Sequence, residues 1–222
     1  MQTQKQILSL NSLILGSVLF TLILWFGQIW FYGGWYFVDN INHVAVTLKY
    51  IGKATALSAT ILICWSFVLT PSIRFVASLF GNKAQLLQKK IQITKIAFVL
   101  MFIDPILLAF NRLTSIPLFL QFFEFRPITS LYGLGHNLGL LLIVLIVGCT
   151  LILKLNWLNS LVRNLSRAFF GLVPFLIFAH ILFVKGDISR YLPLQIWIFG
   201  WIGVSIIAFV VSTINDFRPK SE

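Results

Sequence analysis

The stretch "IQITKIAFVLMFIDPILLAF", residues 91–110, is long and apolar enough to cross a membrane as a helix. It carries one carboxylic acid, Asp104, which is followed directly by Pro105. A carboxylate at mid-membrane depth costs roughly 2.5–3.5 kcal/mol, so such acids are rare and usually have a function. The stretch therefore predicts both a membrane-spanning helix and a candidate site at Asp104.

The whole chain has the composition of a membrane protein. Of its 222 residues 59% are apolar and 10% are charged, and its mean hydropathy is +0.93. Repeated apolar runs of about 20 residues predict an all-α integral membrane protein, a six-helix transmembrane bundle that forms a single transmembrane domain over residues 1–222. The predicted spans cover about 8–31, 48–70, 91–110, 136–154, 168–184 and 193–213. Little length remains for a soluble catalytic domain of normal size.

The basic residues predict the orientation of the spans. The net charge is +11, and the basic side chains lie in loops beside the apolar runs. This is typical of the positive-inside rule, so we expect the lipid bilayer and not a nucleic acid as the partner. The predicted cytoplasmic side carries Lys5, Arg74, Lys83, Lys89, Lys90, Lys154, Arg163, Arg167, Arg218 and Lys220. The other side carries Lys49, Lys53, Arg112, Arg126, Lys185 and Arg190. We therefore expect a multi-pass protein of the cell (inner) membrane with both termini cytoplasmic.

Other features narrow the function. The stretch 111–134 is apolar but interrupted by prolines and charges, which favours an interfacial loop or a short helix on the membrane surface. Cys64 and Cys149 lie in separate predicted spans, where buried small hydrophobic side chains are expected rather than a disulfide or a metal pair. The chain has no phosphate-binding loop, no dinucleotide fingerprint and no catalytic serine motif, so no catalytic residue is assigned.

Two segments carry a family resemblance. Residues 52–110, "GKATALSATILICWSFVLTPSIRFVASLFGNKAQLLQKKIQITKIAFVLMFIDPILLAF", resemble the ferric-reductase-like transmembrane family, and the resemblance extends over about 50–210. In that family one span opens with His-Arg and carries His-Pro 14 residues later. Here Asp104 stands where the second histidine would be and Lys90 where the first would be. In "LNSLVRNLSRAFFGLVPFLIFAHILFV", residues 158–184, His180 fits the second histidine of the family's other ligand helix and Arg167 falls at the first.

The resemblance implies two levels at which haem could lie. Histidines 13 or 14 residues apart on one helix are separated by about 20 Å, so two such helices hold two haems at different depths. At the inner level Lys90 and Arg167 cannot ligate iron while protonated, and we expect them to turn towards lipid phosphates. Because three of the four ligand histidines are absent, no cofactor is assigned, and the outer level alone stays open to haem b.

Asp104 and His180 are predicted to lie at similar depth and to face each other. Three interpretations of this intramembrane polar pair remain open: a structural clamp between helices, a proton or metal site, and a haem site with unusual ligation. His136 and His43 fall on the same outer side. Each of these two alone is expected to be solvated or interfacial, but His136 is a second candidate for cofactor binding.

The sequence thus predicts a divergent ferric-reductase-like membrane protein. Its expected role is that of a haem-poor subunit or accessory of a transmembrane electron-transfer system, and any enzymatic role would be that of an oxidoreductase component. The family resemblance implies a separate flavoprotein or another membrane subunit as partner. The alternative is a small transporter or channel that uses Asp104 and His180 as a proton or ion site.

Overall fold

The computed structural model describes residues 2–40, 44–70, 74–80, 82–110, 124–154, 171–184 and 191–217, with residues 162, 165, 169 and 188. These residues form helices, turns and short connections, and no strand occurs among them. The helices divide into two compact units, which are described separately. The first unit contains α1 (Gln2–Asn40), α2 (Val44–Val68), α3 (Arg74–Phe80), α4 (Lys83–Phe110) and α9 (Leu192–Phe217). The second contains α6 (Leu131–Lys154) and α8 (Val173–Val184).

Local signals set the helix ends. Asn82 caps α4: its side-chain Oδ1 accepts a hydrogen bond from the backbone N of Gln85 at 2.9 Å, and Gln85 Oε1 accepts one from the backbone N of Asn82 at 3.4 Å. This reciprocal arrangement is a capping box. Just beyond the C-terminal end of α2, Thr70 precedes Pro71 in the sequence. A proline disfavours the helical conformation of the residue before it. Helix α2 accordingly ends at Val68.

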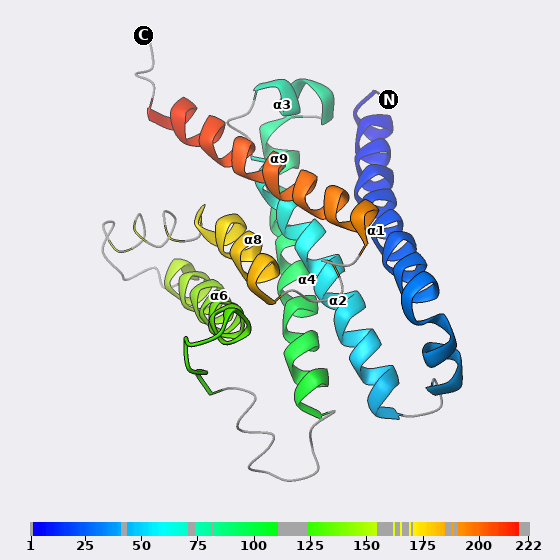
Figure 1. Ribbon diagram of the computed structural model, residues 1–222. Helices are drawn as coiled ribbons and strands as arrows, with labels where there is room; N and C mark the ends of the chain where they lie inside the picture. The colour runs from blue at the N-terminus through cyan, green and yellow to red at the C-terminus, as the bar shows by residue number, and fades with distance from the viewer. Residues whose placement is uncertain are drawn as a thin grey trace. The chain divides into compact units, whose positions relative to one another are not determined.

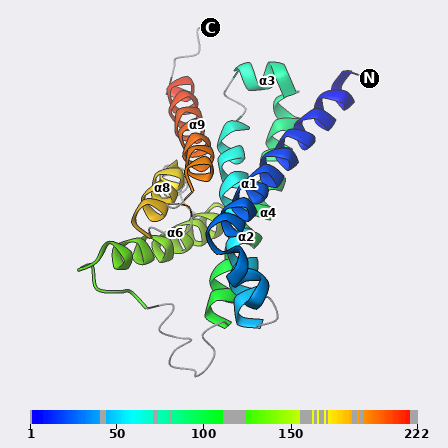
Figure 2. The ribbon, with the colours of Figure 1, turned by 45° about the vertical axis from the view of Figure 1, so that its right-hand side comes forward.

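Helix α2 is the centre of the first unit, where it contacts α1, α4 and α9. Figures 1 and 2 show α2 and α4 side by side, and the chain direction reverses between them. Every residue from 61 to 67 is buried, on all sides of α2. A helix that is apolar all round is expected to be surrounded by other helices. The packing of three helices around α2 thus explains why residues 61–67 are buried on every side.

Two tryptophans attach α1 to its neighbours. Trp65 Nε1 of α2 donates a hydrogen bond to Ser17 Oγ at 2.8 Å, and Trp197 Nε1 of α9 donates one to Thr21 Oγ1 at 2.8 Å. Ser17 and Thr21 are one helical turn apart and both are buried. The two hydroxyl groups also donate to carbonyls of their own helix, at Ile14 and Ser17. Every polar atom named here is therefore satisfied inside the helix bundle.

The second unit is a helix pair preceded by a turn. Residues 124–130 are not helical, and α6 begins at Leu131. Asn137 holds this turn against α6, because its Oδ1 accepts from the backbone N of Arg126 at 2.7 Å and its Nδ2 donates to the carbonyl of Arg126 at 2.8 Å. The predicted interfacial segment 111–134 is therefore a turn and a helix start where it is described, and residues 111–123 lie outside the described residues.

Within the described parts of the chain, four helices are long and apolar enough to cross a membrane. Their candidate spans are Ser9–Tyr32, Val46–Val68, Leu131–Cys149 and Leu192–Asn215. These correspond to the first, second, fourth and sixth predicted spans, so the prediction of an all-α protein with several membrane-spanning helices is confirmed. The predicted third span lies within α4, which begins at Lys83 rather than at 91. The predicted fifth span contains α8, whose 12 residues are shorter than a bilayer crossing requires. The count of six stays a prediction.

Candidate functional site

Asp104 lies on α4 where this helix packs against Gly52 of α2. A Cβ atom added to Gly52 of α2 would lie 2.8 Å from Asp104 Oδ1, 3.4 Å from its carbonyl oxygen and 3.6 Å from its Cα. Gly52 is therefore the residue whose missing side chain lets the backbone of Asp104 approach α2. Thr55 completes the local arrangement, since its hydroxyl donates to the carbonyl of Gly52 at 2.6 Å.

The charge next to Asp104 comes from α2 as well. Asp104 Oδ1 is buried and has no hydrogen-bond partner among the described residues. Lys53, which follows Gly52 in the chain, interacts electrostatically with this carboxylate. A buried acid needs an opposite charge or hydrogen-bond donors to offset its lost hydration. Lys53 supplies that charge, although the sequence had indicated a role for Lys53 only in setting the orientation of the spans.

The other end of the α2–α4 pair is held by Lys90. Its ammonium Nζ donates to Thr70 Oγ1, just beyond the end of α2, at 3.1 Å. Lys90 and Asp104 are separated by 14 positions, or about 21 Å along α4, so the pair has one polar contact near each end. Lys90 thus turns towards α2, although the sequence predicted that it would reach for lipid phosphates. Arg167 lies outside the described residues.

His180 packs against α6 at Gly139, one turn beyond Gly135. Its Nδ1 lies 2.7 Å from the carbonyl oxygen of Gly135. A Cβ added to Gly139 would lie 2.7 Å from His180 Cε1 and 2.9 Å from Nδ1, and one added to Gly135 would lie 2.8 Å from the backbone N of Val184. The spacing Gly135-x-x-x-Gly139 is the small-residue pattern that lets membrane helices approach closely. The imidazole ring therefore fills the space that a side chain at Gly139 would take.

The hydrogen bond of His180 fixes the roles of its two ring nitrogens. A carbonyl oxygen can only accept, so Nδ1 carries the proton and donates. In the neutral ring Nε2 then holds the lone pair. This tautomer, with Nδ1–H on a backbone carbonyl, is the one commonly found in histidines that bind a metal through Nε2. The arrangement of His180 is therefore compatible with a ligand role and with a purely structural one.

The other predicted site residues are distributed as follows. His136 follows Gly135 on α6 and is partly buried, so both candidate histidines belong to the α6–α8 pair. Asp104 belongs to the other unit, and its pairing with His180 stays a prediction. His43 lies outside the described residues. Cys64 and Cys149 are buried free thiols on α2 and α6, as the sequence predicts.

Sequence reasoning missed the partners and found only the charged or titratable members of these sites. Gly52, Gly135 and Gly139 carry no chemical group, yet each decides how close two helices come. The four-residue spacing of Gly135 and Gly139 is the signal in the sequence that indicates this close packing. The hydroxyls of Ser17 and Thr21 show the same spacing on α1.

The described residues contain no group of three or more His, Cys, Asp or Glu side chains that could hold a metal ion. Comparisons with family models, with curated proteins and with solved structures found no match to this chain.

Proposed function

We propose that the chain is a membrane-embedded subunit or accessory of a transmembrane electron-transfer system, a divergent relative of the ferric-reductase-like proteins. The observation that supports this proposal most is the geometry of His180. Its ring is fixed on α6 by the hydrogen bond to Gly135, and the proton on Nδ1 leaves Nε2 as the ligating atom. A histidine at this position is also what the family pattern requires at the outer level.

The donor groups would allow a haem at the outer level and oppose one at the inner level. His180 would hold the iron through Nε2, with His136 as the second candidate ligand, and bound haem b would supply a one-electron carrier. At the inner level Lys90 donates its ammonium protons to Thr70, so it offers iron no lone pair. The contribution of this chain is to orient the imidazole and to surround it with apolar helices.

The spectrum of the purified protein tests this proposal. We expect the reduced protein to show a Soret band with sharp haem b bands, and His180→Leu to lose them. Leu182→Ala, a change at an exposed position of the same helix, is the control and should keep the bands. If wild-type protein expressed with ample haem is purified without haem, His180 does not bind this cofactor.

The orientation and the partner complete the proposal. The chain lies in the cell (inner) membrane as six spans with both termini cytoplasmic, which the ten-to-six distribution of basic residues supports. A flavoprotein or another membrane subunit delivers electrons from the cytoplasmic side, as the resemblance implies. Reporter fusions at both termini test the orientation. Co-purification of a partner that carries flavin absorbance tests the electron donor.

A small transporter or channel is the second candidate. The observation that favours it is the buried Oδ1 atom of Asp104, an acid that helps pass protons or cations in many membrane proteins. Proteoliposomes with a pH-sensitive dye distinguish the two candidates. Proton flux that Asp104→Asn abolishes would favour transport, whereas a haem spectrum without such flux favours electron transfer.

A further inference from the structure

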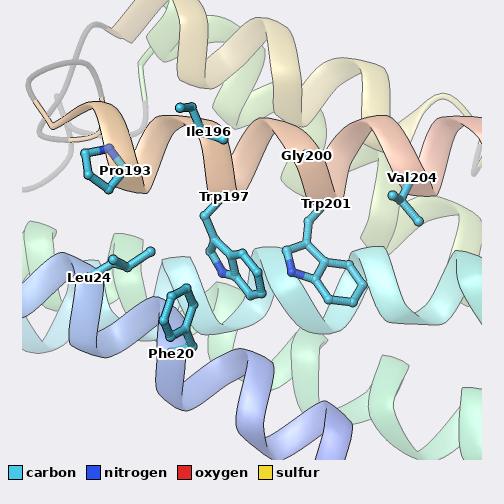
Figure 3. A pocket seen from close by; sticks show the side chains of 8 residues that line it. All are labelled: Phe20, Leu24, Pro193, Ile196, Trp197, Gly200, Trp201 and Val204. Atoms are coloured by element: carbon cyan, nitrogen blue, oxygen red, sulfur yellow. The ribbon is translucent and has the colours of Figure 1, made fainter.

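Helices α1 and α9 of the first unit leave an open groove of about 400 Å³ between them, drawn in Figure 3. Phe20 and Leu24 line it from α1, and α9 lines it from Pro193 to Val204. All eight lining residues are apolar types or glycine. The volume falls within the range of small-molecule binding sites, roughly 300–1,000 Å³.

The aromatic wall of the groove is fixed before any ligand binds. The indole Nε1 of Trp197 donates to Thr21 Oγ1 at 2.8 Å. Its ring also meets Phe20 edge-on, with the ring centroids 4.7 Å apart at 72°. The nitrogen of Trp197 is therefore already used, and its carbon face remains for the groove. Such a surface binds hydrocarbon and offers little to a polar head group.

The length and depth of the groove identify its occupant. From Pro193 to Val204 the lining covers about 16 Å of α9, at 1.5 Å per residue. This is about half of the ~30 Å hydrocarbon core of a bilayer. The candidate span of α9 begins at Leu192, so the groove runs from one edge of the span to its middle. An acyl chain of a lipid in one leaflet covers the same depth, because it also ends at the bilayer centre.

We propose that this groove binds one acyl chain of a membrane phospholipid. The acyl chain enters at the first turn of α9 and lies along the rings of Trp197 and Trp201 as far as Val204. With both termini cytoplasmic, the lipid belongs to the outer leaflet. The site is independent of the proposed electron-transfer role, because neither His180 nor Asp104 lines it.

Glycine positions on α9 provide a matched test. Gly200 lines the groove, and a Cβ there would meet no atom within 4 Å, so a larger side chain fills the groove without a clash at its Cβ. Gly203 also has no atom within 4 Å of a built Cβ but does not line the groove. Gly200→Leu and Gly203→Leu therefore change the same helix by the same group, and only the first blocks the site.

The experiment uses the full chain. Wild type and both variants are reconstituted with a phosphatidylcholine brominated in mid-chain, extracted in mild detergent and analysed by mass spectrometry for retained lipid per protein. We expect Gly200→Leu to retain about fivefold less lipid than wild type and Gly203→Leu, the order expected from losing roughly ten carbon–carbon contacts. The brominated acyl chain should quench more of the tryptophan fluorescence in wild type and Gly203→Leu than in Gly200→Leu, because Trp197 and Trp201 line the groove.

Three outcomes would overturn the proposal. The first is equal lipid retention in Gly200→Leu and wild type. The second is recovery of an isoprenoid quinone, and not phospholipid, from wild type alone. The third is a dimer that Gly200→Leu converts to a monomer, which would assign the groove to a second copy of the chain. If Gly200→Leu does not fold, Val204→Phe blocks the far end of the groove instead. Its control is Val211→Phe, at another exposed position of α9 that does not line it.

Discussion

His180 on α8 donates its Nδ1 proton to the carbonyl of Gly135 on α6 across 2.7 Å, and its ring lies against Gly139. The contact joins α8 and α6 through one titratable side chain, that of His180, and two glycines that have no side chain. It can serve as a structural clamp, and it also sets the tautomer that a ligand histidine needs. Both roles require the same glycines, so substitutions at the glycines test the packing and substitutions at the histidine test the chemistry.

Gly139→Ala should destabilise the α6–α8 pair. The new methyl group would lie 2.7 Å from His180 Cε1, so the ring must move or the helices must separate. Overpacking of this kind costs typically about 1–3 kcal/mol. The measurement is the thermal unfolding midpoint in detergent. Gly148→Ala on the same helix is the control, because its Cβ would meet nothing within 4 Å. Equal midpoints for the two variants would show that His180 does not pack against Gly139.

Gly52→Ala should destabilise the α2–α4 pair in the same way, but through Asp104. The added methyl group would lie 2.8 Å from Asp104 Oδ1, a side-chain atom, and 3.4 Å from the carbonyl oxygen. Removing the carboxylate relieves the closer of the two contacts. We therefore expect Asp104→Ala to suppress much of the loss that Gly52→Ala causes, measured as a double-mutant cycle of unfolding midpoints. Strictly additive losses would place the two residues apart.

The sequence predicted the class of fold because apolar run length is a strong signal. Four of the six expected spans are helices long and apolar enough to cross a membrane. The helix boundaries were less predictable: the first predicted span ends at about 31, whereas α1 continues to Asn40, through the aromatic-rich run 30–37. An aromatic-rich run at the interface is compatible with a helix or a loop, and tertiary context decides between them.

The candidate site was predictable only in part. Asp104 and His180 were singled out because charged and titratable groups are costly in a bilayer. Their contacts at Gly52, Lys53 and Gly135 depend on helix register, and the hydropathy pattern gives no register because α2 is buried on every side over residues 61–67. Lys90 shows the same limit: the sequence placed it just before the third span, whereas α4 begins at Lys83 and contains it, and its bond to Thr70 follows only from the packing of α4 on α2.

Ser17→Ala should destabilise the first unit more than the loss of one hydroxyl group suggests. The change leaves the indole Nε1 of Trp65 buried without its acceptor at 2.8 Å. An unsatisfied buried donor costs about 1–3 kcal/mol, whereas replacing both partners with apolar groups is nearly neutral. The variant Ser17→Ala/Trp65→Phe should therefore unfold closer to wild type than Ser17→Ala does. Thermal unfolding in detergent, followed by circular dichroism, measures the difference. A double variant less stable than either single one would contradict it.

The predicted pair of Asp104 and His180 is tested by removing each partner alone and then both. If the two groups face each other, Asp104→Asn and His180→Leu should each lower the unfolding midpoint, because the survivor remains buried and unsatisfied. The double variant should then recover part of the loss. Lys53 provides the competing explanation, since it interacts with Asp104 from the neighbouring helix. A parallel cycle with Lys53→Met distinguishes the two. Coupling between Asp104 and Lys53, with additive losses for Asp104 and His180, would show that the acid belongs to the α2–α4 pair alone. His180 would then keep its place against Gly135 as an independent site, and the transport interpretation of Asp104 would gain support.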